Sequence, residues 1–424
     1  MKLAITNGRV IDPSQNLDGD YTTFAENGIV TSIHRNKKVP PGFEILDAKG
    51  AIVSPGFIDL HTHLREPGFE YREDIVSGAK AAVAGGFTTI LCMANTKPVN
   101  DNASVTEMII KRAKEVGLAR ILPVGALSKG LQGKELAEIG EMVKAGAVAI
   151  SDDGMPVMHG KLMRHALEYA KSFGVPVITH AEDLTLSDGG CIHEGKVSTA
   201  LGVAGIPEVA EEAMIQRDIL LSKLTRHRLH VAHVSTETGI EMVRQAKKKK
   251  LPVTCEVTPH HLMLTDEACL EYNTHAKVNP PLRTRQDCAA LIEALNDGTV
   301  DAIATDHAPH SEDEKSVGLG CSNFGLIGME TALPVLLKLV HQKKITLKKL
   351  IQLLTMGPAR AMNLKGGSLK KGSPADITIF DPNRPVTIDP NRFFSKSRNT
   401  PFAHWRLKGK VLYTICNGKV VFSS

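Results

Sequence analysis

Eight apolar runs typical of buried β-strands alternate with helical patterns along the middle of the chain. The first run ends at Leu60-His61, and the other seven cover residues 90–95, 121–125, 147–151, 175–180, 229–233, 253–257 and 302–306. Continuous apolar strands joined by helices indicate a parallel sheet covered on both faces, and eight such units close a (β/α)₈ TIM barrel. A doubly wound open sheet is the alternative, although no Gly-x-Gly-x-x-Gly turn and no Walker lysine follows any of the runs.

The helices expected between these strands are recognised from apolar periodicity and from their ends. Gly85, Gly117, Gly146 and Gly174 each stand just past the end of a pattern, where glycine commonly caps a helix. The predicted helices cover residues 74–84, 104–116, 134–144, 162–172, 207–223, 236–249 and 285–296, with another over 329–341 after the eighth strand.

Both ends of the chain differ from this middle part and have the composition of short strands with turns. The strand candidates are residues 3–5, 10–12 and 28–33 at one end, and 375–380, 409–415 and 419–422 at the other. Because a lone two-stranded ribbon is marginally stable, we expect the two ends to pair into one small β-sandwich-like module. The prediction is a composite module of residues 1–52 plus 366–424 and a barrel of residues 53–365.

Charge and composition exclude several other classes of protein. The net charge of +5 comes from 51 basic and 46 acidic residues, a near balance that indicates no nucleic-acid surface. Seven cysteines without a Cys-x-x-Cys pair are typical of a reducing, cytoplasmic setting. No apolar segment approaches 18 residues, so we expect a soluble protein without a membrane span.

Polar residues that can bind a metal follow most of the predicted strands. Side chains two apart in a strand share a face, so His61 and His63 can offer two imidazole nitrogens to one cation. In a barrel of this kind the active site lies at the carboxyl ends of the strands, where further candidates would meet this pair. They are Asn95, Asp152, Asp153, His180, His233, Asp306, His307 and His310. Nitrogen and carboxylate ligands together suit Zn²⁺, so the sequence predicts a zinc site at this rim.

The residues around these candidates form strings that resemble one known family. His61 to Gly68 reads His-Thr-His-Leu-Arg-Glu-Pro-Gly, and Ala304 to His310 reads Ala-Thr-Asp-His-Ala-Pro-His. With these strings, and others along nearly the whole chain, the sequence resembles the bacterial class I dihydroorotases of the amidohydrolase superfamily. His-x-His alone indicates only the superfamily, whereas the Arg-Glu-Pro-Gly continuation and the second string are much narrower.

The resemblance implies a metal centre that holds one or two Zn²⁺ ions. The implied ligands are His61, His63 and Asp306 for one zinc, and His180 and His233 for the other. Many members of the superfamily bridge the metals with a carboxylated lysine from the fourth strand. This chain has no lysine there and offers Asp153 in its place, as one branch of the class I dihydroorotases does. Because side chains alternate along a strand, only one of Asp152 and Asp153 can face inward.

The activity implied by the resemblance is the zinc-dependent, reversible cyclisation of N-carbamoyl-L-aspartate to L-dihydroorotate and water in de novo pyrimidine (UMP) biosynthesis. Asp306 would be the catalytic residue, because a carboxylate at the metal can shuttle a proton between water and the ring nitrogen. The substrate carries a carboxylate, which suits the planar guanidinium of Arg65. The implied substrate contacts are His63, Arg65, Asn95, Asn279, His310, Phe324 and Gly325.

Other interpretations stay open for some residues. Arg65 could instead form a surface ion pair with Glu66 or Glu70. His230 and His260-His261 are expected to support the metal ligands or to pack, since their spacing does not make them ligands. The polar stretch 310–324 contains two glycines and is expected to form a mobile lid over the site.

Two kinds of protein rival this interpretation. Dihydropyrimidinases, hydantoinases and allantoinases are related cyclic-amide hydrolases, but they usually depend on the lysine that this chain lacks. A non-catalytic partner of aspartate transcarbamoylase is a rival of another class, and the full set of metal ligands argues against it. The resemblance also suggests a homodimer and a possible complex with aspartate transcarbamoylase.

Overall fold

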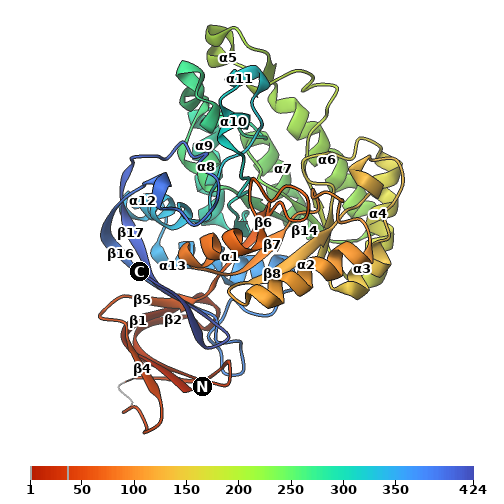
Figure 1. Ribbon diagram of the computed structural model, residues 1–424. Helices are drawn as coiled ribbons and strands as arrows, with labels where there is room; N and C mark the ends of the chain where they lie inside the picture. Colours follow the sequence, from red (N-terminus) through yellow and green to blue (C-terminus); the bar gives the residue numbers. More distant parts are fainter. Residues whose placement is uncertain (1, 36–37) are drawn as a thin grey trace.

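The computed structural model describes residues 2–35 and 38–424, which form a barrel and a smaller sheet beside it (Figure 1). Residues 1, 36 and 37, which belong to the predicted 1–52 segment, lie outside the described residues.

Eight parallel strands form the barrel, each hydrogen-bonded to the next along the chain. An isolated parallel bridge between Thr62 and His307 joins the first strand to the segment after the last one and closes the ring. The strands are β6 (Phe57–Thr62), β7 (Phe87–Cys92), β8 (Arg120–Gly125), β9 (Ala149–Ser151), β10 (Val177–Thr179), β13 (Leu229–Val231), β14 (Val253–Val257) and β15 (Ala302–Ile303). The predicted (β/α)₈ barrel is therefore confirmed.

Helices cover the outside of this barrel in the order expected. They are α1 (Ile75–Ala84), α2 (Ala103–Val116), α3 (Ile139–Ala145), α4 (Gly160–Phe173), α6 (Glu208–Thr225), α7 (Glu237–Lys248), α9 (Arg285–Asp297) and α12 (Ala332–His341). The helix predicted over 134–144 begins only at Ile139, because Leu136 instead forms a β-bridge with Ser128. The helix predicted over 329–341 begins at Ala332, since Thr331 bonds back to Gly328.

Two apolar clusters hold the barrel together. Alternate strand residues face opposite sides, so one cluster lies between strands and helices and the other within the ring. The inner cluster includes Ile58, Leu60 and Ile178, and it continues into Ala359 and Ala361 of α14 (Met356–Ala361). Since α14 contacts both β6 and β15, it helps to fix the strands at the point of closure.

The two ends of the chain build the second sheet together. In Figure 1 the red N-terminal strands lie beside the blue C-terminal ones, and β5 pairs antiparallel with β16. Its strands are β1 (Lys2–Asp12), β2 (Leu17–Glu26), β3 (Ile29–His34), β4 (Glu44–Asp47), β5 (Ile52–Pro55), β16 (Ile377–Thr387), β17 (Arg406–Cys416) and β18 (Lys419–Ser423). The expected composite module is confirmed, whereas its bounds at 52, 53, 365 and 366 stay a prediction.

Short elements occupy the connections. They are helices α5 (Lys196–Leu201), α8 (Pro259–Met263), α10 (Glu312–Lys315), α11 (Gly318–Cys321) and α13 (Leu347–Leu354), and strands β11 (Ile192–His193) and β12 (Gly205–Ile206). Within the described residues, no helix combines the length and the apolar character needed to cross a membrane.

Candidate active site

A cluster of histidines and carboxylates lies at the carboxyl ends of the barrel strands. Parallel strands all deliver their last residues to one rim, so side chains far apart in the sequence meet there. His61 and His63 come from the end of β6, and Asp153, His180, His233 and Asp306 follow β9, β10, β13 and β15. All six are buried, with exposed fractions of 6% or less. The six residues predicted as metal ligands are thus brought together.

Asp153 stands between the two histidine pairs. Its Oδ2 lies 3.2 Å from His61 Nε2 and 3.5 Å from His63 Nε2. Its Oδ1 lies 3.5 Å from His180 Nδ1 and 3.4 Å from His233 Nε2. One carboxylate therefore turns one oxygen toward each pair.

Asp306 faces only one of these pairs. Its Oδ1 lies 3.1 Å from His63 Nε2 and 3.6 Å from His61 Nε2. Burial alone would raise the pKa of Asp306, but the adjacent rings of His61 and His63 hold that pKa well below its ordinary value. The carboxylate is therefore ionised at neutral pH and can accept a proton.

Several buried atoms of the cluster lack a hydrogen-bond partner among the described residues. They are His61 Nε2, Asp153 Oδ1 and His233 Nδ1. Leaving a buried polar atom unpaired costs about 1–3 kcal/mol, and more for a charged group. Two three-residue sets also hold their ligand atoms within 4.8 Å of one another: His61, Asp153 and His233, and His61, His63 and Asp306. The donor set and its unsatisfied atoms fit a bound cation, and nitrogen with carboxylate oxygen fits Zn²⁺.

The far nitrogen of each of three imidazoles is held by a neighbour, which fixes the ring orientation. His61 Nδ1 lies 2.9 Å from Glu256 Oε1, and His180 Nε2 lies 3.1 Å from Glu182 Oε2. His63 Nδ1 lies 2.9 Å from Asn95 Oδ1. Such partners orient metal ligands and raise their basicity. The other ring nitrogens, His61 Nε2, His63 Nε2 and His180 Nδ1, therefore point at Asp153.

Glu256 and Glu182 were not among the sequence candidates. The signal for Glu256 was a carboxylate inside the apolar strand 253–257. Burial would raise its pKa, yet hydrogen bonds from His230 and His61 lower the pKa of Glu256 to about 2. His230 Nε2 lies 3.1 Å from its second oxygen, so His230 contacts the same carboxylate that holds His61.

The two aspartates after β9 have different surroundings. Asp152 accepts hydrogen bonds from the backbone N–H groups of Leu127 and Ser128 at 2.7 and 2.9 Å, and from the Ser128 hydroxyl. Its oxygens are therefore occupied. Of the pair, Asp153 is the one that faces the histidines, in line with alternation along a strand.

A cavity of about 430 Å³ opens above the cluster. All seven residues predicted to contact the substrate line it: His63, Arg65, Asn95, Asn279, His310, Phe324 and Gly325. Asn279 donates to Glu182 Oε2 at 2.8 Å, which leaves its amide oxygen available to a ligand. We call the cluster of histidines and carboxylates the floor of this cavity. Its wall is formed by polar and cationic groups, among them Arg65, Asn95, Asn279 and His310.

Arg65 is buried in this wall and forms no ion pair with Glu66 or Glu70. Its Nε donates to Pro309 O at 3.2 Å, and one terminal nitrogen lies 3.3 Å from His310 Nε2. Burial lowers the pKa of Arg65 to about 10, so the guanidinium stays charged at neutral pH. Burial and that nearby charge lower the pKa of His310 to about 3, so the imidazole is neutral.

Three of these residues have backbone conformations that L-residues rarely adopt. Arg65, His233 and Asp306 have φ values of 63°, 32° and 47°. Residues held in such regions cost about 1–3 kcal/mol each and cluster at functional sites. The turn at Asp306 also explains why β15 ends at Ile303, earlier than the predicted 302–306 strand.

The remaining sequence candidates surround the cluster without joining it. His307 Nε2 lies 3.2 Å from Glu73 Oε2, and His261 Nε2 donates to Pro280 O at 2.9 Å. His260 is buried, and burial lowers its pKa to about 4. The stretch 310–324 contains the short helices α10 and α11, and whether it moves as a lid stays a prediction.

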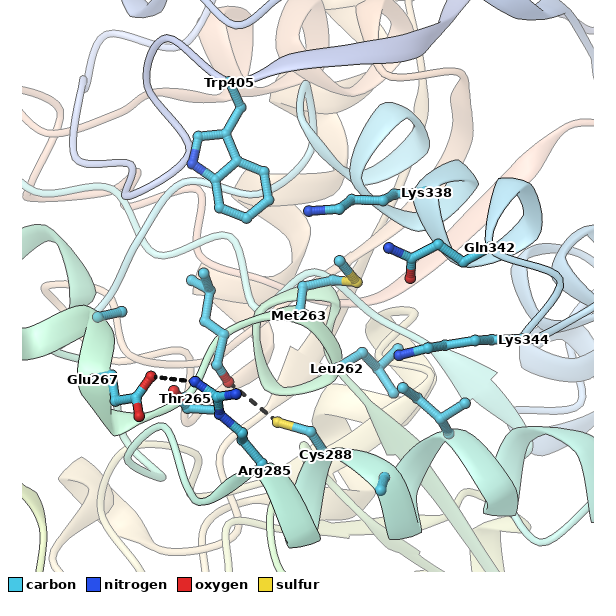
Figure 2. Close-up of a pocket in the computed structure, with 14 residues that line it drawn as sticks. Leu262, Met263, Thr265, Glu267, Arg285, Cys288, Lys338, Gln342, Lys344 and Trp405 are labelled. Carbon is cyan, nitrogen blue, oxygen red and sulfur yellow. Dashed lines mark hydrogen bonds and ion pairs between the residues drawn. The ribbon is translucent and has the colours of Figure 1, made fainter.

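A second, larger cavity of about 580 Å³ lies away from this rim, where α8, α9 and α12 meet (Figure 2). Two of its charged groups have partners: Arg285 bonds Glu267 at 2.9 Å, and the Lys338 ammonium lies 4.5 Å from the Trp405 ring centre. Burial raises the pKa of Cys288 to about 11, so this thiol is not a ready nucleophile. The strand-end cavity is therefore the candidate active site.

Comparison with known proteins agrees with this geometry. Residues 52–421 match the amidohydrolase family. The dihydroorotase of Syntrophotalea carbinolica is 50% identical over 422 residues, covering 100% of this chain and 99% of that protein. The dihydroorotase of Geobacter metallireducens is 51% identical over 422 residues, covering all of both chains.

Solved structures of more distant proteins share the fold. The L-hydantoinase (dihydropyrimidinase) from Arthrobacter aurescens superposes with a TM-score of 0.89 at 25% identity, covering 99% of this chain and 96% of that one. The dihydropyrimidinase from Brevibacillus agri has a TM-score of 0.84 at 24% identity, covering 100% and 95%.

Proposed function

We propose that this chain, which belongs to the amidohydrolase family and within it to the dihydroorotases, interconverts L-dihydroorotate and N-carbamoyl-L-aspartate at the strand-end cavity. The observation that carries the proposal is the pairing of two features in one cavity. Asp153 is shared by two histidine pairs, and the buried Arg65 lies in the adjoining wall. The first suits a hydrolytic metal centre and the second an acidic substrate.

We assign zinc as the metal: His61, His63 and Asp306 would hold one ion, His180 and His233 would hold a second, and Asp153 would be available to both. Bound Zn²⁺ would lower the pKa of a water and polarise the carbonyl under attack. The supporting observation is that each oxygen of Asp153 faces its own histidine pair, which favours two ions over one.

The protein's own contribution to the chemistry is proton transfer and orientation. Asp306 takes the proton of the attacking water and delivers it to the ring nitrogen as the amide C–N bond breaks. In ring closure the same steps run backwards. N-Carbamoyl-L-aspartate has one more carboxylate than dihydroorotate, so ring closure consumes a proton and is favoured at lower pH.

Substrate recognition is assigned to the wall of the cavity. Arg65 binds the substrate carboxylate through its planar guanidinium, and Asn95, Asn279 and His310 bind around the ring. His63 and the Phe324–Gly325 backbone complete the contacts. Hydantoin and dihydrouracil carry no carboxylate, so the same wall would disfavour them.

We also propose the setting in which the protein works. All seven cysteines are free thiols, which suits the reducing cytoplasm. Family resemblance supports a homodimer and a possible complex with aspartate transcarbamoylase. Sedimentation of the purified chain, alone and with aspartate transcarbamoylase, tests both assemblies.

The proposed function is tested by counting zinc in the purified protein and measuring turnover on dihydroorotate, unsubstituted dihydrouracil and hydantoin. We expect turnover on dihydroorotate to exceed that on the two neutral rings. Asp153→Ala should lower the zinc count per chain. Equal turnover on all three rings would overturn the assignment of Arg65 as the residue that binds the substrate carboxylate.

A further inference from the structure

Two lysines are buried behind the cavity wall without a carboxylate partner. Lys277 and Lys315 are 3% and 1% exposed, and neither forms an ion pair within the described residues. A buried ammonium is unfavourable unless other groups replace its lost water. The contacts of these two lysines therefore show which part of the protein depends on them.

Lys315 ties the end of the loop to the barrel. Its Nζ donates to the carbonyl oxygens of Asn323 at 2.7 Å, Gly325 at 3.1 Å and Lys277 at 3.4 Å. These three acceptors match the three donors of an ammonium. Lys315 itself lies at the end of α10, so it closes the loop between α10 and Gly325.

Lys277 holds the middle of the same loop. Its Nζ donates to Leu319 O at 2.7 Å and Gly320 O at 3.3 Å, and lies 4.5 Å from the ring centre of Phe324. Its backbone carbonyl also accepts from the Gly325 N–H at 2.9 Å. The two lysines therefore fasten residues 318–325 at four carbonyls and one aromatic ring.

The fastened segment ends in the wall of the active-site cavity. Asn323, Phe324 and Gly325 line that cavity, whereas neither lysine does. Gly325 lies so close to the rim that a Cβ there would stand 2.7 Å from Ala308 Cβ, and its φ is 131°. A small displacement of the segment would therefore change the shape of the cavity beside His310.

We propose that Lys277 and Lys315 are positioning residues that hold Phe324 and Gly325 in place to receive the substrate ring. This inference rests on the proposed function, since it takes the cyclic acid as the ligand. The lysines act through the 318–325 segment and touch neither the metal ligands nor the cavity. Their loss should therefore weaken substrate binding and leave the metal centre and the chemical step intact.

The test compares Lys315→Met and Lys277→Met, which keep an unbranched side chain and remove the ammonium. Lys223→Met on α6 is the matched control, because Lys223 is exposed and has no bonded partner among the described residues. We expect KM for dihydroorotate to rise about tenfold in each loop variant, because the segment that carries Phe324 and Gly325 loses buried hydrogen bonds to its carbonyl oxygens. We expect kcat and zinc content to stay within about twofold of wild type, as binding and not chemistry changes.

Hydrogen exchange gives a readout that does not depend on turnover. Peptides covering 318–326 should exchange faster in both loop variants, with other regions unchanged. The double variant should raise KM by less than the product of the single effects, because both lysines hold one segment.

Three outcomes separate the hypotheses. Wild-type protein without dihydroorotate turnover would contradict the proposed function, whereas the exchange result would still report on the segment. Unchanged KM in both variants of an active enzyme would overturn the positioning role. A lowered melting temperature with uniformly faster exchange and unchanged KM would show that the lysines support only the fold.

Discussion

The floor and the wall of the cavity differ in how their polar groups are satisfied. Within the described part of the chain, the floor contains buried atoms without hydrogen-bond partners, among them His61 Nε2 and Asp153 Oδ1. In the wall, by contrast, Arg65 is bonded to Pro309 and His310, and Asn279 to Glu182. The donor set of the floor therefore fits a bound cation, whereas the polar groups of the wall already bond to one another. We therefore expect the floor to serve the chemical step and the wall to serve substrate recognition.

The two parts are also positioned by different elements. The predicted metal ligands stand at the ends of strands whose hydrogen bonds fix them, while Phe324, Gly325 and His310 stand on the segment after β15. Sites on strands are held more rigidly than sites on loops. Changes in the floor should therefore act on turnover or metal binding, and changes in the wall on KM.

The largest effect is expected from Asp306→Asn. An amide cannot accept the proton, so hydrolysis and ring closure should both fall by about a thousandfold or more, within the range of general acid–base effects. The measurement is the rate in each direction, with Asp188→Asn, an exposed aspartate, as control. A variant with near-normal rates would remove Asp306 from its role.

Glu256→Gln should affect the floor indirectly, through its contact with His61. Loss of the charge next to His61 Nδ1 should weaken metal binding by about 10–100-fold, the usual effect of losing such a partner. Zinc titration against a competing chelator measures this, with Glu107→Gln on the surface of α2 as control. An unchanged zinc affinity would mean that His61 needs no orienting partner.

Arg65→Met should act on the wall alone. Losing a charged hydrogen bond of about 1.5–3 kcal/mol should raise KM for dihydroorotate by about 10–100-fold. Zinc content should not change, and turnover on hydantoin should not fall. Steady-state kinetics on both rings checks this, with the exposed Arg360→Met as control. If zinc were lost instead, floor and wall would not be separable.

The smallest effect concerns pH. The pKa of His310 is lowered to about 3, so the ring stays neutral above that pH and should not titrate in the working range. KM for dihydroorotate should then change by less than about twofold between pH 6 and 8, where an ordinary histidine would change charge. A KM that follows an apparent pKa near 6.5 and becomes flat in His310→Asn would contradict the shift.

The strand-end ligands could be predicted because they follow a pattern. His61 and His63 stand two apart after an apolar run, and His180, His233 and Asp306 each follow another run. A parallel barrel brings all such positions to one rim. The family resemblance added the predicted substrate contacts, and all of these residues line the cavity.

The supporting residues could not be predicted in the same way. Glu182 lies two residues from His180, yet nothing in the sequence says which nitrogen it would hold. Lys277 and Lys315 look like ordinary surface lysines, and only the folded chain shows them buried against carbonyl oxygens. Their roles arise from contacts between distant segments, which have no local signature.

The sequence by itself determined the barrel, the composite module and the metal-binding rim, because apolar periodicity and strand ends are local properties of the chain. Only the tertiary structure decided that Asp153 faces the histidines while Asp152 is held by Ser128, and that Arg65 is buried beside His310. The physical reason is that burial and hydrogen-bond satisfaction are set jointly by segments that lie 24 to 245 residues apart in these contacts. A pattern along one strand cannot encode them.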